Sequence, residues 1–134
     1  MVPTCRHCGA QASALANYVC IHARMTTYVM IVQMTALPQW LGLDRSARQE
    51  VIREQARPVF DAHKDCRVRW VDAEAMTASC SDVMLVETGD LTRWNHLWEA
   101  MRDTAIFTVP YFRVEAITPG IEDGYLAYEA TLQQ

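Results

Sequence analysis

Residues 26–37 read TTYVMIVQMTAL, a β-branched and apolar run in which Gln33 is the one strongly polar side chain. Apolar residues at both parities of such a run are typical of a strand that is covered on both faces. Pro38 and Gly42 then interrupt the pattern, which predicts a loop or short turn over residues 38–44. We therefore expect a central strand here, with the remaining elements packed around it.

A helix is predicted to follow this strand. Ser46 and Gln49 match a capping box, and the residues after them repeat at helical spacing. The positions of that repeat are Ala47, Val51, Ile52, Ala56, Val59, Phe60 and His63. Pro58 falls inside the helix, and we expect a kink there because its ring removes one hydrogen bond and clashes with the preceding turn.

Three further strands are predicted. In residues 66–75, CRVRWVDAEA, apolar and charged side chains alternate, and residues 80–88, CSDVMLVET, form the next extended run. Residues 109–117, VPYFRVEAI, alternate again, and Pro119 with Gly120 should end this strand.

A second helix lies between the last two of these strands. Asp90 is a suitable N-cap residue, and an apolar stripe follows it, formed by Leu91, Trp94, Leu97, Trp98 and Met101. The tail at residues 121–130, IEDGYLAYEA, is expected to be an added edge strand or a docking arm.

The resulting order, β-α-β-β-α-β, predicts an α+β fold of the ferredoxin-like sandwich type. Right-handed crossovers place both helices on one face of a four-stranded antiparallel sheet, so the other face is left bare. We expect that face to carry Gln33, Arg69, Val71, Leu85, Glu87, Tyr111, Arg113, Glu115 and Ile117. Apolar surface of this kind usually meets a partner, and the predicted partner is a second copy, which would form a homodimer around a cavity.

Composition limits the class of protein. The chain has 134 residues, the length of one domain, and a formal charge of -4, which argues against a nucleic-acid partner. No apolar run is long enough for a membrane span, and no secretory signal is recognised. Five cysteines without a framework spacing indicate a reducing compartment, so a cytoplasmic location is expected.

The first 24 residues differ from the rest because they contain no Asp or Glu and hold three of the five cysteines. Cys5, Cys8, Cys20 and His22 could in principle close a zinc site, although the spacing of Cys20 and His22 is short for such a motif. We favour an irregular or disordered extension over residues 1–24, ahead of a single domain at residues 25–134.

Carboxylates gather in the middle of the predicted sheet, around the stretch DAEAMTASCSDVMLVET. Asp72 and Glu74 share the strand parity of Trp70, so either the strand ends near Trp70 or these acids are buried with partners. Our candidates for general acid or base at the mouth of the cavity are Asp72, Glu74 and Asp82, with Tyr111 as a hydroxyl donor.

The candidate ligand-binding residues are Arg69, Trp70, Arg113 and Glu115. An arginine on the bare face could bind a carboxylate, phosphate or enolate oxygen; the alternative is that Arg113 pairs with a glutamate. No other metal site, activated cysteine, phosphate loop or dinucleotide fingerprint is recognised, and we expect no cofactor.

Four stretches resemble the darcynin family of small bacterial proteins: ALPQWL, VDAEAMTASCSDVMLVET, LWEAMRDTAIFTVPYF and GIEDGYLAYE. The resemblance covers residues 25–129 and leaves the cysteine-rich head outside. It implies a dimeric α+β barrel, and it transfers no catalytic residue to this chain. Other dimeric α+β barrels include cofactor-free oxygenases, cyclases, isomerases and binding proteins, and fold alone does not choose among them.

Two hypotheses of function follow. The first is a small-molecule site in the cavity of a homodimeric barrel, either a binding site or a cofactor-independent enzyme of the proton-transfer, isomerase or cyclase type. Its ligand would be an apolar, oxygenated metabolite such as those of secondary metabolism. The second is a non-catalytic dimer that uses the sheet face only for association. An enzyme should leave charge inside the cavity, whereas an interface should pair or exclude it.

Overall fold

The computed structural model describes residues 26–133. Residues 27–120 form one compact unit, and residues 121–133 belong to a second. The expected extension at residues 1–24 and the four possible zinc ligands, Cys5, Cys8, Cys20 and His22, lie outside the described residues.

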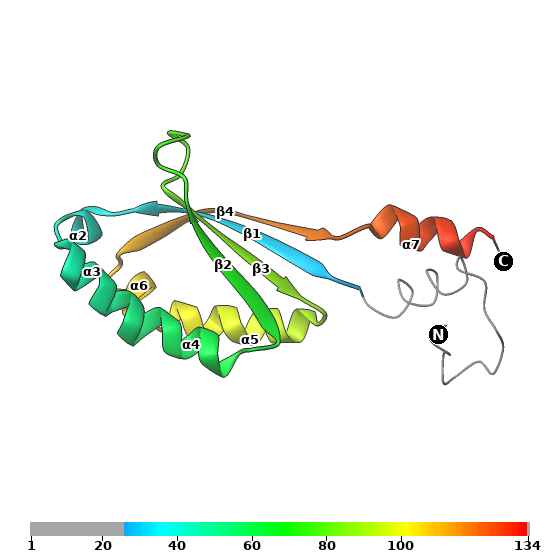
Figure 1. The fold of residues 1–134 in the computed structure, drawn as a ribbon, viewed down its shortest axis with the longest axis horizontal. Coiled ribbons are helices and arrows are strands. Elements are labelled where there is room, and N and C mark those ends of the chain that lie inside the picture. Colours follow the sequence, from blue (N-terminus) through cyan, green and yellow to red (C-terminus); the bar gives the residue numbers. More distant parts are fainter. Residues whose placement is uncertain (1–25, 134) are drawn as a thin grey trace, which may run out of the picture. The chain divides into compact units, whose positions relative to one another are not determined.

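The larger unit is built on one four-stranded antiparallel sheet with the strand order β2-β3-β1-β4 (Figure 1). The strands are β1 (Tyr28–Ala36), β2 (Cys66–Asp72), β3 (Asp82–Thr88) and β4 (Phe112–Ile121). β3 pairs with β1 on one side and with β2 on the other, with Met34 and Asp72 both opposite Asp82. The predicted ferredoxin-like α+β sandwich is confirmed.

Helices cover one face of this sheet, and the loop that joins β2 to β3 projects on the opposite side (Figure 1). The helical segments of this unit are α2 (Pro38–Leu41), α3 (Arg45–Val51), the π-helical segment η1 (Ile52–Ala56), α4 (Arg57–Ala62), α5 (Leu91–Arg102) and α6 (Ala105–Thr108). The core lies between the sheet and the helices. Its fully buried side chains include Val32, Met34, Met84, Val86, Leu97, Met101, Ile106 and Phe112.

Strand alternation places the side chains as the sequence predicts. On one parity, Met30, Val32 and Met34 of β1 and Met84, Val86 and Thr88 of β3 are buried, and Cys66 begins the covered parity of β2. The opposite parity forms what we call the outer sheet face. Its residues include Val29, Ile31, Gln33, Arg67, Arg69, Val71, Val83, Leu85, Glu87, Arg113, Glu115 and Ile117.

The first helix differs in detail from its prediction. Its N-cap is Asp44, whose Oδ1 accepts a hydrogen bond from the N–H of Ala47 at 2.7 Å, rather than Ser46. The irregularity expected at Pro58 is the π-helical segment η1, and the N–H of Arg57 bonds to the carbonyl of Ile52, five residues earlier. A π turn is one way for a helix to pass a residue that has no N–H.

Three expectations for the second half of the chain are wrong. Pro119 and Gly120 do not end β4, which continues to Ile121; β4 is an edge strand, where proline is tolerated. Leu91 is 47% exposed and does not belong to the buried stripe of α5. The tail forms a helix, α7 (Gly124–Thr131), so of its two alternatives, an edge strand or a docking arm, the edge strand is wrong; the helix follows Asp123, which has a positive φ of 52°.

Candidate functional site

A pocket of about 280 Å³ lies at the end of the sheet where β1 and β2 finish and β3 begins. We call it the acidic pocket, because three carboxylates line it together with two tryptophans and one arginine. Its lining residues are Ala36, Trp40, Leu41, Arg48, Trp70, Asp72, Glu74 and Asp82. All three carboxylates that the sequence offers as candidate acid or base residues, and the candidate ligand-binding residue Trp70, meet here.

The register of the sheet brings the carboxylates together. Asp72, the last residue of β2, is directly opposite Asp82, the first residue of β3. The N–H of Ala73 donates to the carbonyl of Ser81 at 2.9 Å, so the pairing continues one step into the loop that carries Glu74. Asp72 and Glu74 are exposed and Asp82 is half-buried, so the acids stand where the helix-covered face opens to solvent.

Asp82 is held in one orientation by two donors. Trp70 Nε1 donates to Asp82 Oδ1 at 2.9 Å, and Ser81 Oγ donates to Asp82 Oδ2 at 2.7 Å. Ser81 Oγ also accepts a hydrogen bond from the N–H of Ala36 at 2.6 Å, which ties the end of β1 to the start of β3. Asp72 has no such side-chain hydrogen bond among residues 26–133, so the two facing carboxylates have unequal environments.

Trp40 and Arg48 form the opposite side of the pocket. Arg48 Nε donates to the carbonyl of Trp40 at 3.2 Å, and its Nη2 donates to the carbonyl of Leu41 at 3.1 Å. Its guanidinium lies 5.8 Å from the centroid of the Trp40 ring. The two pocket tryptophans both pack on Phe112, with ring centroids 4.9 Å away for Trp40 and 5.5 Å for Trp70. The aromatic side chains of the pocket are therefore anchored on the core.

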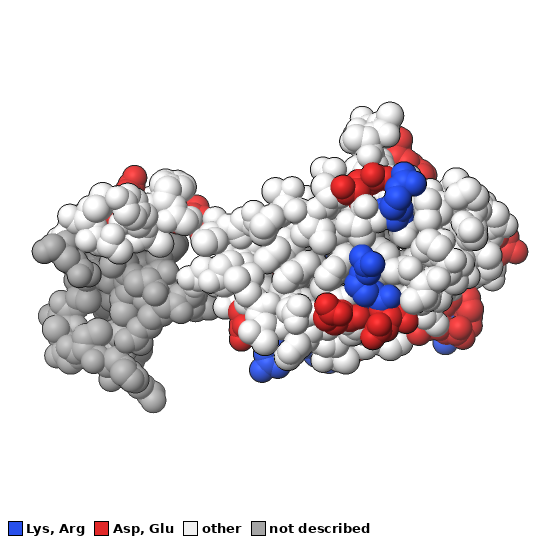
Figure 2. Space-filling view, turned by 180° about the vertical axis from the view of Figure 1, so that it is seen from behind, with Lys and Arg blue, Asp and Glu red and all other residues white. Residues whose placement is uncertain are grey.

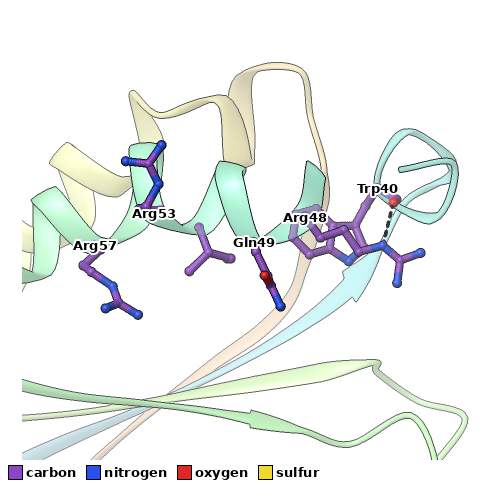
Figure 3. A pocket seen from close by; sticks show the side chains of 6 residues that line it. Trp40, Arg48, Gln49, Arg53 and Arg57 are labelled. Atoms are coloured by element: carbon purple, nitrogen blue, oxygen red, sulfur yellow. Dashed lines mark hydrogen bonds between the residues drawn. The ribbon is translucent and has the colours of Figure 1, made fainter. Parts of the chain in front are cut away.

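A second hollow of about 500 Å³ adjoins the acidic pocket, since Trp40 and Arg48 line both. We call it the basic groove; its other lining residues are Gln49, Ile52, Arg53 and Arg57. Figure 3 shows that Gln49 and Arg57 project to the same side of the helix, whereas the guanidinium of Arg53, which also lines the groove, is turned away from them. Arg53 forms ion pairs with Glu50 and Glu54.

The remaining predicted ligand-binding residues lie on the outer sheet face, away from the acidic pocket. Arg69 is 3.5 Å from Glu87, and Arg113 Nη2 donates to Glu115 Oε1 at 2.7 Å. The hydrogen bond from Arg113, followed by one from Thr35, holds the pKa of Glu115 below its ordinary value. On the face drawn in Figure 2, basic groups likewise lie beside acidic ones rather than in a patch of a single sign.

Tyr111 is also separate from the carboxylates. Its ring packs against Trp40 at a centroid distance of 5.7 Å, and the side chain is partly buried against the core. Its place in the structure is that of a packing residue behind the pocket.

Residues 26–133 contain no group of three or more His, Cys, Asp and Glu side chains that could hold a metal ion. His63 Nδ1 lies 2.7 Å from the carbonyl of Val59 at the end of α4. Burial raises the pKa of the Cys66 thiol, which makes this cysteine a poor nucleophile. Among the helices described, none has the length and apolar character needed to span a bilayer.

Sequence reasoning missed three residues of the site. Trp40 falls in the predicted loop, Arg48 in the predicted helix and Ser81 in the predicted strand over residues 80–88, and none of them was predicted to belong to a site. Asp44 as the N-cap residue was the available signal for Arg48. It sets the start of the helix at Arg45, which places Arg48 in the first turn.

Comparison with known proteins decides the family. The model of the darcynin family, described as a domain of unknown function, matches residues 14–132. This chain belongs to the darcynin family. The predicted resemblance is confirmed, and the match begins upstream of residue 25, within the stretch expected to be an extension.

Two relatives of this darcynin-family chain illustrate the match. Darcynin 1 of Acinetobacter baumannii is 38% identical over 90 residues, which is 67% of this chain and 100% of that protein. Darcynin of Chromobacterium violaceum is 41% identical over 78 residues, 58% of this chain and 99% of that protein.

Solved structures similar to this chain include the chlorite dismutase of Candidatus Nitrospira defluvii in complex with imidazole. The TM-score is 0.64 at 12% identity, and the match covers 90% of this chain and 55% of that one. A mutant of the same enzyme gives a TM-score of 0.61 at 14% identity, with 81% and 48% of the two chains covered. The darcynin-family chain spans about half the length of these enzymes, and the likeness shows the fold alone.

Proposed function

We propose that this darcynin-family protein binds a small molecule in the acidic pocket, and that the ligand presents a positively charged group to the carboxylates. One observation carries the proposal: Asp72 and Asp82 face each other across β2 and β3, with Glu74 beside them, in a hollow bordered by Trp40 and Trp70.

The electrostatics of the pocket support a cationic ligand. Like charges directly opposite each other on a sheet are destabilising. None of the ion pairs within residues 26–133 involves Asp72, Glu74 or Asp82. Arg48 lines the same pocket, yet its described hydrogen bonds are to backbone carbonyls. A bound ammonium or amidinium group would neutralise the excess charge, and the tryptophan rings offer cation–π contact.

Benzylamine is a suitable probe, because it joins an ammonium group to an aromatic ring. We expect binding to perturb tryptophan fluorescence, and we expect Asp72→Asn with Glu74→Gln to weaken it at least tenfold. Glu99→Gln removes one exposed carboxylate from α5 and serves as the control. Absence of benzylamine binding, or equal weakening by the control, would contradict the proposal.

For the outer sheet face we propose a homodimer interface. The face combines apolar side chains, such as Ile31 opposite Leu85 and Val71 opposite Val83, with charges that are paired within the chain. Paired charge around apolar surface is what an interface requires. The sequence-based prediction placed dimer formation and ligand binding on the same bare face. In this proposal dimer formation uses the outer sheet face, and ligand binding uses the acidic pocket on the helix-covered side.

A second candidate function is proton transfer in the same pocket. It is favoured by the unequal environments of two facing carboxylates, one fixed by Trp70 and Ser81 and the other without such partners in the described chain. Such an enzyme would exchange a C–H proton of a bound carbonyl compound with solvent. Deuterium incorporation in D₂O, lost in Asp72→Asn, would support it; binding without exchange across a panel of amino ketones would contradict it.

We also propose a cytoplasmic location. Cys66 and Cys80, the two cysteines within the described residues, are both free thiols, as a reducing compartment would keep them.

A further inference from the structure

We propose that the acidic pocket and the basic groove form a single bipolar site that takes a small zwitterion. The ammonium group of the ligand would lie among Asp72, Glu74 and Asp82, and its carboxylate or other anionic group would lie toward Arg48 and Arg57. This inference rests on the proposed function, and it adds the second half of the ligand.

Continuity between the two hollows is the first support. Trp40 and Arg48 line both, so the carboxylates on one side and the arginines on the other share one aromatic ring and one guanidinium. Two of the five N–H groups of Arg48 donate to the carbonyls of Trp40 and Leu41, which fixes the guanidinium between the two halves. Its other N–H groups have no partner among residues 26–133 and can donate to an anion.

The π-helical segment is the second and independent support. An α-helix turns by about 100° per residue, so Gln49 and Arg57, eight residues apart, would differ by about 80° in an uninterrupted helix. The i→i+5 turn at η1 accommodates one extra residue, which brings the difference to about 20°. Arg57 therefore points to the same side as Gln49, as Figure 3 shows, and both line the groove together with Arg48.

This arrangement gives the irregular helix a function. Pro58 produces the break in α-helical bonding, and the break places Arg57 over the groove. Insertions of this kind occur often at functional sites. Arg57 forms no ion pair within the described part of the chain, whereas Arg53, which also lines the groove, is neutralised by Glu50 and Glu54.

The charges on either side of Trp40 favour a zwitterion over a simple ion. A purely cationic ligand would meet the Arg48 guanidinium at the boundary of the two hollows, and a purely anionic one would meet three carboxylates. A ligand with both signs of charge satisfies both halves.

Three probes of similar shape test the inference: benzylamine, 4-(aminomethyl)benzoate and 4-methylbenzoate, each titrated against the full chain by tryptophan fluorescence. We expect the zwitterion to bind about tenfold tighter than benzylamine, the scale of one charge-assisted hydrogen-bonded contact. The anion alone should bind more weakly than either. Equal affinity for benzylamine and the zwitterion would overturn the inference.

Two matched arginine variants locate the effect. Arg57→Gln should weaken zwitterion binding about threefold to fivefold, the range of an exposed ion pair, and leave benzylamine binding within about twofold. Arg93→Gln, on α5 and outside the lining of both hollows, should change neither. Equal effects of the two variants would overturn the inference.

The outcomes distinguish this inference from the function on which it rests. Binding of benzylamine that depends on Asp72 but gains nothing from the added carboxylate keeps the proposed function and overturns the bipolar site. Failure of both amines to bind overturns both.

Discussion

Replacing Asp72 by asparagine should make the protein more stable while it impairs ligand binding. Asp72 and Asp82 are directly opposite each other on β2 and β3, and none of the ion pairs within residues 26–133 involves either of them. Facing side chains on a sheet have Cβ atoms about 5 Å apart, and such pairs contribute about 0.2–1 kcal/mol. Because asparagine removes the repulsion and retains the shape, the free energy of unfolding should rise by about 0.5 kcal/mol.

Urea denaturation at neutral pH measures this change, at two salt concentrations. The gain of Asp72→Asn should be largest at about 0.02 M salt and should shrink at about 1 M salt, where the screening length is about 3 Å. Glu99→Gln, which removes a carboxylate from the exposed side of α5, should change stability by less than about 0.5 kcal/mol at both salt concentrations.

A loss of stability in Asp72→Asn at low salt would refute the reasoning, because it would mean that the native protein uses the Asp72 charge in a favourable contact. An unchanged stability that is independent of salt would also refute it. Either result would remove the argument that the pocket holds unneutralised charge for a ligand.

Three other predictions follow from the structure. Ser81→Ala should lower the free energy of unfolding by about 2 kcal/mol in urea denaturation, because it leaves the N–H of Ala36 without its acceptor. Ser79→Ala in the exposed loop is the control and should lower the free energy of unfolding by less than about 0.5 kcal/mol. Equal losses of stability in the two variants would contradict this prediction. Leu85→Lys on the outer sheet face should halve the mass measured by light scattering, and a mass unchanged from the native protein would contradict the interface. The hydrogen bond from Arg113 lowers the pKa of Glu115 in the folded protein, so the Arg113–Glu115 contact contributes to stability above the unfolded pKa near 4.5, and this contribution is lost as the pH falls through the lower folded pKa. The melting temperatures of the native protein and of Arg113→Gln should therefore converge in that acid range. A difference in melting temperature that stays constant with pH would contradict this prediction.

The sheet could be predicted from the sequence because alternation over short runs reports which side chains are buried. Cys66, Val68 and Trp70 face the helices as expected, and the same parity carries Asp72 to the helix-covered side, where it meets Asp82. Of the two alternatives, a strand that ends near Trp70 and buried acids, the structure has the first: β2 ends at Asp72, two residues after Trp70, and Asp72 and Glu74 are exposed.

The arginines of the site, Arg48 and Arg57, are placed by tertiary packing, and hydrophobic periodicity in the sequence does not indicate such packing. Arg48 belongs to a regular helical pattern, and only the carbonyl acceptors of Trp40 and Leu41 show that it faces the pocket. Pro58 predicted an irregular helix, but its consequence for Arg57 follows from the type of irregularity, a π turn. The edge-strand alternative for the tail was wrong, because Tyr125 and Tyr128 are three residues apart, a spacing that suits a helix such as α7 better than a strand.

The most direct test of the acidic pocket uses the four tryptophans of the chain as separate reporters. Indole N–H resonances of the ¹⁵N-labelled protein should be followed during titration with benzylamine. Trp70, whose Nε1 donates to Asp82, and Trp40 should shift together, while Trp94 and Trp98, stacked on each other along α5, should remain in place. Shifts confined to Trp94 and Trp98, or none at all, would contradict the account.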